Sequence, residues 1–314
     1  MKRVFLTGGS GFVGSNLIPE LIKENYDIYA LTRYVSNRTP KYPKEVNVVY
    51  GDLRDSLLIK KLIKDISPEI VVHLGAISPV QQSFGHSQEV FEINTLGTMI
   101  LADANLNNSN LEKFIFAGTS EMYGNSAMET LQPLNEHDVL KPNQPYAISK
   151  VAAFNYLNYL REAYNFPACT ARPFNTYGRT ENFNFVTERI IWNMLTHDKE
   201  ITMGNPGPIR DLLYIKDHVS GYMSLLKSDE LLSTVNFCTG KMTSIKELAE
   251  KIAKILDWKG EIIWGRTMKR PTEIDVLVGD NWLAKSVLDW EPKYSLDEGL
   301  KLTIEAIKKL KTCE

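Results

Sequence analysis

Tyr146 and Lys150 are a pair of side chains whose types and spacing could do chemistry. On a helix, residues four apart lie on one face, so the phenol and the ammonium group would be neighbours. A positive charge nearby lowers the pKa of a phenol, and a phenolate near neutral pH can remove the proton of an alcohol whose carbon gives up a hydride. The same spacing also arises by chance, as a half-buried tyrosine beside a solvated lysine, so the surrounding residues must decide.

A hydroxyl group and a carboxylate, those of Thr119 and Glu121, come directly after the apolar run 114–117. Such a run is typical of a buried strand, and both side chains would then emerge at the carboxyl edge of a sheet. Ligands of open α/β sheets bind at that edge. The sequence therefore predicts that Thr119 and Glu121 meet a bound dinucleotide there.

A glycine loop comes after the first apolar run and opens a predicted helix, with Gly8, Gly11 and Gly14 at a GxxGxxG spacing around Phe12 and Val13. Gly8 would permit a tight turn, Gly11 the close approach of a pyrophosphate, and Gly14 the close contact of helix with strand. Helix N-terminal amides would supply the donors. The alternative is a glycine-rich turn without a ligand, and the strand-turn-helix context favours the cradle.

The choice of dinucleotide depends on the end of the second predicted strand. An Asp or Glu there would accept the ribose hydroxyls of NAD, and this chain has Thr32 and Arg33 instead. Arg33, assisted by Arg38, can form a fork to a ribose 2′-phosphate, so NADP is favoured and NAD stays possible. In the alternative, both arginines are solvated loop charges.

The elements that must position these residues alternate along the chain. Strand-like runs are separated by amphipathic stretches, which predicts an α/β, doubly wound parallel sheet with helices on both faces. The strand-like runs are 4–6, 27–32, 46–50, 70–74, 113–117 and 168–171, and the helix-like runs are 12–24, 57–65, 88–106, 186–196, 243–256 and 296–310. We expect a dinucleotide-binding domain in residues 1–174 plus about 211–239, and a smaller α/β C-terminal lobe in about 175–210 and 240–314.

Composition excludes several classes of function. The 314 residues are 43% hydrophobic and carry a net charge of −2, without the basic excess of a nucleic-acid-binding protein or an apolar run long enough for a membrane. Three cysteines, Cys169, Cys238 and Cys313, are too few and too far apart for a disulfide framework or a metal site, and the five histidines lack metal-ligand spacing. We expect a cytoplasmic protein without a metal.

Taken in order, these motifs resemble the extended short-chain dehydrogenase/reductases, a family of nucleotide-sugar epimerases, dehydratases, decarboxylases and reductases. The motifs are the glycine loop, Gly51-Asp52-Leu53, the run 73–78, Asn94 with Gly97-Thr98, Thr119-Ser120-Glu121, Tyr146 to Lys150, and Arg172-Pro173-Phe174-Asn175. The resemblance implies a Rossmann-type fold with a nucleotide-sugar substrate, and family members commonly pair through the helix that carries the Tyr-Lys motif. A homodimer or homotetramer is therefore expected.

The resemblance also implies roles for individual residues. Asp52 and Leu53 would hold the adenine, Leu74 and Ala76 the ribose and nicotinamide side, and Tyr146 with Lys150 the nicotinamide ribose. Thr119 would hydrogen-bond the sugar O4. The candidate nucleotide-sugar contacts are Ser78, Asn175, Arg179, Arg210, Arg270 and Glu273.

Two features of those contacts leave alternatives open. The less favoured alternative for Arg210 and Arg270 is a surface or interlobe salt bridge. Related dehydratases have a Pro-Arg-Arg stretch ahead of Phe-Val-Thr, where this chain has the run 179–182, so a phosphate or substrate contact there is absent or replaced.

The identity of the reaction depends on the chemistry at C5 and C6 once C4 has been oxidised. In a 4,6-dehydratase a carboxylate removes the C5 proton, water leaves from C6 and hydride returns to C6, and Glu121 is the candidate. Thr119-Ser120-Glu121 resembles the GDP-mannose 4,6-dehydratase branch. A 4-epimerase or a 4-keto-6-deoxy sugar reductase of the same family remains the alternative, a decarboxylase ranks below both, and a noncatalytic NADP-binding regulator is a distant fourth.

Overall fold

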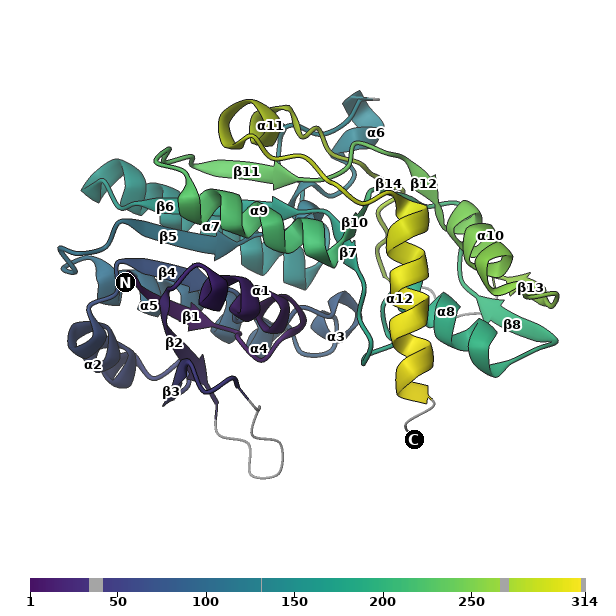
Figure 1. The fold of residues 1–314 in the computed structure, drawn as a ribbon. Helices are drawn as coiled ribbons and strands as arrows, with labels where there is room; N and C mark the ends of the chain where they lie inside the picture. The colour runs from purple at the N-terminus through teal and green to yellow at the C-terminus, as the bar shows by residue number, and fades with distance from the viewer. Residues whose placement is uncertain (34–41, 131, 266–270, 312–314) are drawn as a thin grey trace.

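A parallel sheet of seven strands forms the centre of the computed structural model, which describes residues 1–33, 42–130, 132–265 and 271–311. Its strand order is β11-β6-β5-β4-β1-β2-β3, and every neighbouring pair is parallel (Figure 1). The strands are β1 (Arg3–Thr7), β2 (Asp27–Thr32), β3 (Val46–Tyr50), β4 (Ile70–His73), β5 (Lys113–Ala117), β6 (Ala168–Pro173) and β11 (Thr234–Phe237). The predicted doubly wound α/β fold is confirmed.

Helices cover both faces because the central strands are apolar on both sides. Val4 and Phe5 are adjacent and both fully buried, so they point to opposite faces and into separate cores. One face is covered by α1 (Phe12–Lys23) and α9 (Ile215–Lys227), and the other by α2 (Ser56–Ile66), α5 (Gly97–Asn105) and α7 (Pro145–Tyr164) (Figure 1).

A smaller lobe lies beyond the carboxyl ends of the strands (Figure 1). Parallel pairs join β7 (Asn175–Tyr177) to β10 (Leu212–Tyr214) and β8 (Glu200–Met203) to β13 (Glu261–Trp264). A third small sheet has β9 (Ile209–Arg210) between β12 (Thr243–Ser244) and β14 (Val276–Leu277). Besides α9, the helices in the second half of the chain are α8 (Val186–Thr196), α10 (Ile245–Leu256), α11 (Trp282–Leu288) and α12 (Leu296–Lys311).

The predicted helix 88–106 is interrupted. It consists of α4 (Ser87–Phe91), a π-helical turn η1 (Glu92–Leu96) and α5. The turn places Asn94 in the interior, where its amide accepts the N–H of Ile77 at 2.8 Å and donates to Ser149 Oγ at 3.1 Å. Periodicity alone does not reveal this irregularity, which ties the loop after β4 to helix α7. Two further short helices, α3 (Val80–Ser83) and α6 (Ser126–Thr130), lie in connecting segments.

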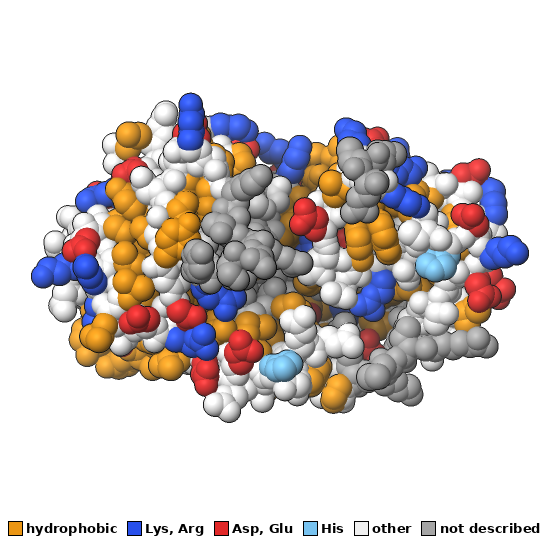
Figure 2. Space-filling view, turned by 90° about the horizontal axis from the view of Figure 1, so that it is seen from below, with side chains coloured by type: hydrophobic (Ala, Val, Ile, Leu, Met, Phe, Trp, Pro, Cys, Tyr) orange, Lys and Arg blue, Asp and Glu red, His pale blue; other side chains and the backbone are white. Residues whose placement is uncertain are grey.

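The surface is mixed in charge. Basic and acidic side chains are interspersed over the described part of the face seen in Figure 2. Within the described residues, no helix is both long and apolar enough to cross a membrane. The seven strands of the main sheet fall inside the ranges expected for the dinucleotide-binding domain, and the division into two domains stays a prediction.

Candidate active site

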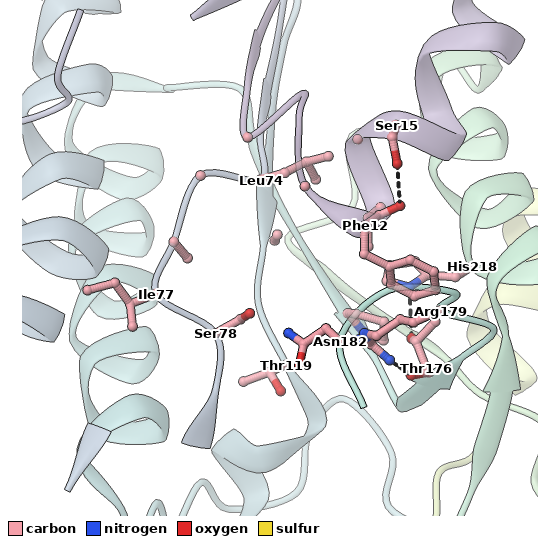
Figure 3. A pocket seen from close by; sticks show the side chains of 18 of the residues that line it. Phe12, Ser15, Leu74, Ile77, Ser78, Thr119, Thr176, Arg179, Asn182 and His218 are labelled. Carbon is pink, nitrogen blue, oxygen red and sulfur yellow. Dashed lines mark hydrogen bonds between the residues drawn. The ribbon is translucent and has the colours of Figure 1, made fainter. Parts of the chain in front are cut away.

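A cavity of about 1040 Å³ opens where β1, β4, β5 and β6 end (Figure 3). Its lining runs from the glycine loop at one end to Thr119, Tyr146 and Lys150 at the other, and includes the segment after β7. Single small-molecule sites span about 300–1,000 Å³, so this cavity is large enough for an extended ligand or for two ligands side by side. The structure thus brings together the glycine loop and the Tyr-Lys pair, which are more than a hundred residues apart in the sequence.

The dinucleotide end is built from backbone. Gly8 has φ 72°, a left-handed conformation, and its carbonyl accepts the N–H of Gly11 at 3.0 Å. A Cβ on Gly14 would lie 2.4 Å from that carbonyl oxygen, so only glycine lets α1 start this close to β1. Phe12 and Val13, in the first turn of α1, also line the cavity. The free amides of this turn form an anion site of the kind that holds a pyrophosphate.

A buried histidine supports this end, and sequence reasoning assigned it no role. The ring of His73 lies between the hydroxyls of Thr7 (Nδ1, 2.7 Å) and Thr98 (Nε2, 2.9 Å). Thr7 Oγ1 also accepts the N–H of Gly75 at 2.9 Å. Burial lowers the pKa of His73 to about 3, so the ring is neutral and acts as a hydrogen-bonding spacer between β1, β4 and α5. Its only sequence signal is its place at the end of an apolar strand.

The predicted adenine and ribose contacts line the same cavity. They are Arg33, Asp52, Leu53, Leu74 and Ala76. The carboxylate of Asp52 accepts from Arg54 Nε at 2.9 Å and Nη2 at 2.8 Å, and the Arg54 guanidinium lowers the pKa of Asp52 to about 2. Arg33 is exposed at the end of β2, and Arg38 lies outside the described residues.

Tyr146 stands in the first turn of α7, and a hydrogen bond joins it to Thr119. Burial, with a smaller contribution from the charge of Glu121, raises the pKa of Tyr146 to about 12. The Thr119 hydrogen bond and the charge of Arg179 act in the opposite direction. The phenol is therefore protonated near neutral pH in this structure. A phenol joined to Thr119 at the edge of the sheet is placed to exchange a proton with a hydroxyl bound between them.

The prediction that Lys150 lowers the pKa of Tyr146 is wrong for this structure. Lys150 Nζ donates to the carbonyl of Ala117 at 2.7 Å and lies 4.6 Å from the centre of the Phe116 ring. The ammonium group thus points toward the end of β5, although Lys150 and Tyr146 share a helix face. Its charge does not contribute to the shift in the pKa of Tyr146. Burial lowers the pKa of Lys150 itself to about 7.

Glu121 reaches the cavity from the short helix η2 (Ser120–Tyr123), which Thr119 caps by accepting the N–H of Glu121 at 3.3 Å. Its carboxylate accepts a hydrogen bond from the side-chain amide of Gln144, a buried residue just ahead of α7. Gln144 therefore orients Glu121, and sequence reasoning missed it. Its signal is a polar side chain directly ahead of the proline that begins helix α7.

Arg179 lies between two aromatic rings, with Cζ 4.2 Å from the centre of Phe12 and 3.7 Å from that of Phe185 (Figure 3). Nη1 donates to the Thr176 carbonyl at 2.6 Å and pairs with Glu188 at 3.5 Å. Arg179 thus lines the cavity, and its guanidinium bridges the glycine helix and the segment after β7.

The other predicted substrate contacts divide into two groups. Ser78 and Asn175 line the cavity, whereas Arg210 and Glu273 are not among its lining residues. The prediction for Arg210 and Glu273 is therefore not supported in this structure. Arg210 is buried in β9, with Nη1 donating to the carbonyl of Ile209 at 2.9 Å, and Glu273 is exposed. Arg270 lies outside the described residues.

Several side chains that line the cavity have buried polar atoms without a hydrogen-bond partner among the described residues. These atoms include Asn175 Oδ1, His218 Nε2 and Tyr222 Oη. Buried polar atoms are nearly always paired in folded proteins, so these atoms fit a polar ligand. Together with the glycine cradle they fit a nicotinamide dinucleotide, with the pyrophosphate at the N-terminus of α1.

A glycine cradle and a Thr-Tyr-Lys constellation on a doubly wound sheet define the extended short-chain dehydrogenase/reductases, which confirms the resemblance seen in the sequence. The chain belongs to the GDP-mannose 4,6 dehydratase family, whose profile matches residues 5–303. The human GDP-mannose 4,6 dehydratase is 31% identical to it, over 96% of this chain and 90% of that protein.

Two solved structures of epimerases are also similar. UDP-glucose 4-epimerase of Thermotoga maritima, solved with UDP-glucose, has a TM-score of 0.90 at 26% identity and covers 99% of this chain and 100% of its own. UDP-glucuronic acid 4-epimerase of Bacillus cereus, in complex with UDP-glucuronic acid and NAD, has a TM-score of 0.87 at 25% identity, over 98% and 99% of the two chains. This chain is an enzyme of the nucleotide-sugar dehydratase and epimerase class.

Proposed function

We propose that this protein is an NADP-dependent 4,6-dehydratase acting on GDP-mannose or a similar nucleotide sugar. The observation that carries the proposal is the placement of Glu121, a carboxylate that lines the same cavity as Tyr146 and lies two residues beyond Thr119. A base for the sugar O4 and a carboxylate for C5 thus stand at one site. Membership of the GDP-mannose 4,6 dehydratase family supports the same reaction.

The dinucleotide would lie along the carboxyl edge of the sheet. The α1 amides around Gly11 would hold its pyrophosphate, Asp52 and Leu53 the adenine, and Arg33 the 2′-phosphate. We favour NADP because β2 ends in Thr32 and Arg33 without a carboxylate. When bound, the nicotinamide supplies a hydride acceptor for C4, a hydride donor for C6 and, in its oxidised form, a positive charge.

The protein's own groups move the protons. Thr119 binds and orients O4, and Tyr146 takes its proton. Because burial holds the pKa of Tyr146 near 12, the phenol needs positive charge close by. The charge of Arg179 already lowers that pKa, and Lys150 would add to this effect if its ammonium group left the carbonyl of Ala117.

The resulting C4 ketone acidifies the C5 proton. Glu121, held by Gln144, removes that proton and returns a proton to the C6 hydroxyl as it leaves as water.

A 4-epimerase is the second candidate, because the Thermotoga maritima epimerase shares this fold over the whole chain. An epimerase needs the O4 chemistry and no proton transfer at C5. The two reactions therefore differ in what the carboxylate of Glu121 does, and the same difference separates a dehydratase from a 4-keto-6-deoxy sugar reductase.

Product mass in deuterated water tests the proposal. The purified protein, alone and then with NADP, is incubated with GDP-mannose and with UDP-, dTDP- and CDP-hexoses. A dehydratase gives a product that has lost one water and gained one deuterium at C5. An unchanged mass with inverted stereochemistry at C4 would identify an epimerase, and turnover only with NADPH and a 4-keto-6-deoxy sugar would identify a reductase.

The variant Glu121→Gln tests the assigned carboxylate. It should still oxidise C4, seen as NADPH absorbance, but release no water. Glu181→Gln, which changes another carboxylate at the cavity, is the matched control and should dehydrate normally. Dehydration retained in Glu121→Gln would remove Glu121 from this role.

The remaining assignments complete the proposal. Ser78, Asn175 and Arg179 would contact the nucleotide sugar from within the cavity, and Arg270, outside the described residues, stays a predicted contact. We propose a homodimer or homotetramer that works in the cytoplasm, where the two described thiols, Cys169 and Cys238, remain reduced as the structure has them.

A further inference from the structure

The segment 179–184 connects β7 to α8 and is fastened at both ends; we refer to it as the strap. At its start, the backbone N–H of Arg179 donates to Glu188 Oε1 at 3.0 Å, and the guanidinium lies between Phe12 and Phe185. Toward its other end, the ring of Phe183 stacks on Trp192 at 4.3 Å between centres and 10° between planes. The backbone between these anchors has little freedom to relax.

Asn182, between the anchors, has a left-handed backbone with φ 98°. Non-glycine residues rarely adopt positive φ, and the strain is kept only where the surroundings impose it. The other described non-glycine residues with positive φ stand at or just beyond helix ends, where such a conformation is routine: Asn25, Ser67, Asn165, Asp257 and Asp289. Of these six residues only Asn182 lines the cavity.

The orientation of the Asn182 amide is set by one hydrogen bond. Its Oδ1 accepts the backbone N–H of Asn184 at 3.2 Å, and a backbone N–H can only donate, so the accepting end of the amide is the oxygen. The Nδ2 group, with two N–H donors, is the other end. In Figure 3 the carboxamide extends into the cavity on the side of Thr119 and Ser78.

We propose that Asn182 is a substrate-binding residue that recognises the hexose, with Nδ2 donating a hydrogen bond to a sugar hydroxyl beside O4. This inference rests on the proposed function, which places O4 at Thr119 and Tyr146. A neutral amide donor suits a neutral hydroxyl, whereas the diphosphate is better matched by arginine and by helix amides.

Calorimetric binding of a nucleotide sugar and of its nucleoside diphosphate separates the hexose contact from all others. Wild type and Asn182→Gly are titrated with GDP-mannose and GDP, and then with UDP-glucose and UDP. Asn182→Gly removes the amide and relieves the strained φ, so the protein stays folded. Losing one hydrogen bond should weaken sugar-nucleotide binding about 10-fold, with binding of the diphosphate changed less than about twofold.

Two further variants sharpen the result. Asn165→Gly removes an asparagine of positive φ at the end of α7, away from the cavity lining, and should bind both ligands as wild type does. Asn182→Asp keeps the shape and replaces the donor with an acceptor, so it should lose as much hexose affinity as Asn182→Gly.

The outcomes distinguish this inference from the function on which it rests. If wild type binds sugar nucleotides and Asn182→Gly binds them equally well, the role of Asn182 is wrong and the proposed function is untouched. If both ligands weaken equally, Asn182 supports the nucleotide side and the hexose contact is wrong. If wild type binds no sugar nucleotide, the proposed function fails and this inference with it.

Discussion

The two ends of the cavity are built in different ways. At the dinucleotide end, three glycines and the first turn of α1 line the cavity, so the proposed pyrophosphate site depends on backbone within seven consecutive residues. At the sugar end, side chains converge from η2, from α7 and from the strap. A site made of local backbone is encoded by spacing in the sequence, whereas a site made of converging side chains is encoded only by the whole fold.

Removing the phenol should have the largest effect and leave the dinucleotide end intact. In Tyr146→Phe the rate of C4 oxidation should fall by roughly 10²- to 10⁴-fold, because no base remains at O4. NADPH affinity, measured by fluorescence, should stay within about threefold of wild type, because the pyrophosphate site is backbone and Tyr146 would give the dinucleotide one contact only, at the nicotinamide ribose. A comparable loss of NADPH affinity would show that the two ends are not separate.

Adding one methyl group at Gly14 should weaken binding at the dinucleotide end of the cavity. In Gly14→Ala the new Cβ would lie 2.4 Å from the Gly8 carbonyl oxygen, so the cradle must open. Overpacking of this kind costs about 1–3 kcal/mol, which corresponds to roughly 5- to 150-fold weaker NADPH binding. Gly85→Ala, where a Cβ would meet no atom within 4 Å, is the control and should bind normally.

Arg179 should connect the two ends, because it packs on Phe12 of the glycine helix and begins the strap. Replacing it with methionine removes the cation–π contacts, which are worth about 0.5–2 kcal/mol. NADPH and the nucleotide sugar should each bind roughly 3- to 10-fold more weakly, as measured by calorimetry. Weakening of one ligand alone would assign Arg179 to that end only.

The last prediction concerns the stability of the fold, and not ligand binding or rate, through the pKa of Lys150. Burial lowers its pKa from the ordinary 10.5 to about 7 in the folded protein, so the unfolded chain binds the extra proton between those values. The free energy of unfolding therefore receives a contribution that rises with pH from about 7 to 10.5. Urea unfolding of Lys150→Met at pH 7, 8 and 9 should show a smaller rise than wild type.

The exposed Lys60→Met, on α2, is the control for that measurement and should keep the slope of wild type. Equal slopes in wild type and Lys150→Met would mean that Lys150 is not held in a desolvated site. Lys150 would then be able to reach the phenol, as the sequence predicted.

The sequence predicted most of what is local. β2 and α8 have the bounds that the periodicity indicated, and the glycine loop stands where its spacing placed it. What failed is the direction of two side chains, which spacing in the sequence does not encode: Lys150 donates to a carbonyl of β5, and Arg210 donates to the carbonyl of the neighbouring Ile209. The π-helical turn at Asn94 escaped notice because it keeps the apolar pattern while adding one residue to a turn.

β11 is the last strand of the main sheet to be synthesised, and this order has a consequence for the nascent chain. β11 covers the outer side of β6, yet the whole of the strap, α8 and α9 is made between them. Until Thr234–Phe237 leaves the ribosome, β6 is an open parallel edge with unpaired amides and carbonyls. The nascent chain is therefore most exposed to edge-to-edge aggregation over this interval, and its sheet can be completed only when about three quarters of the protein has been made.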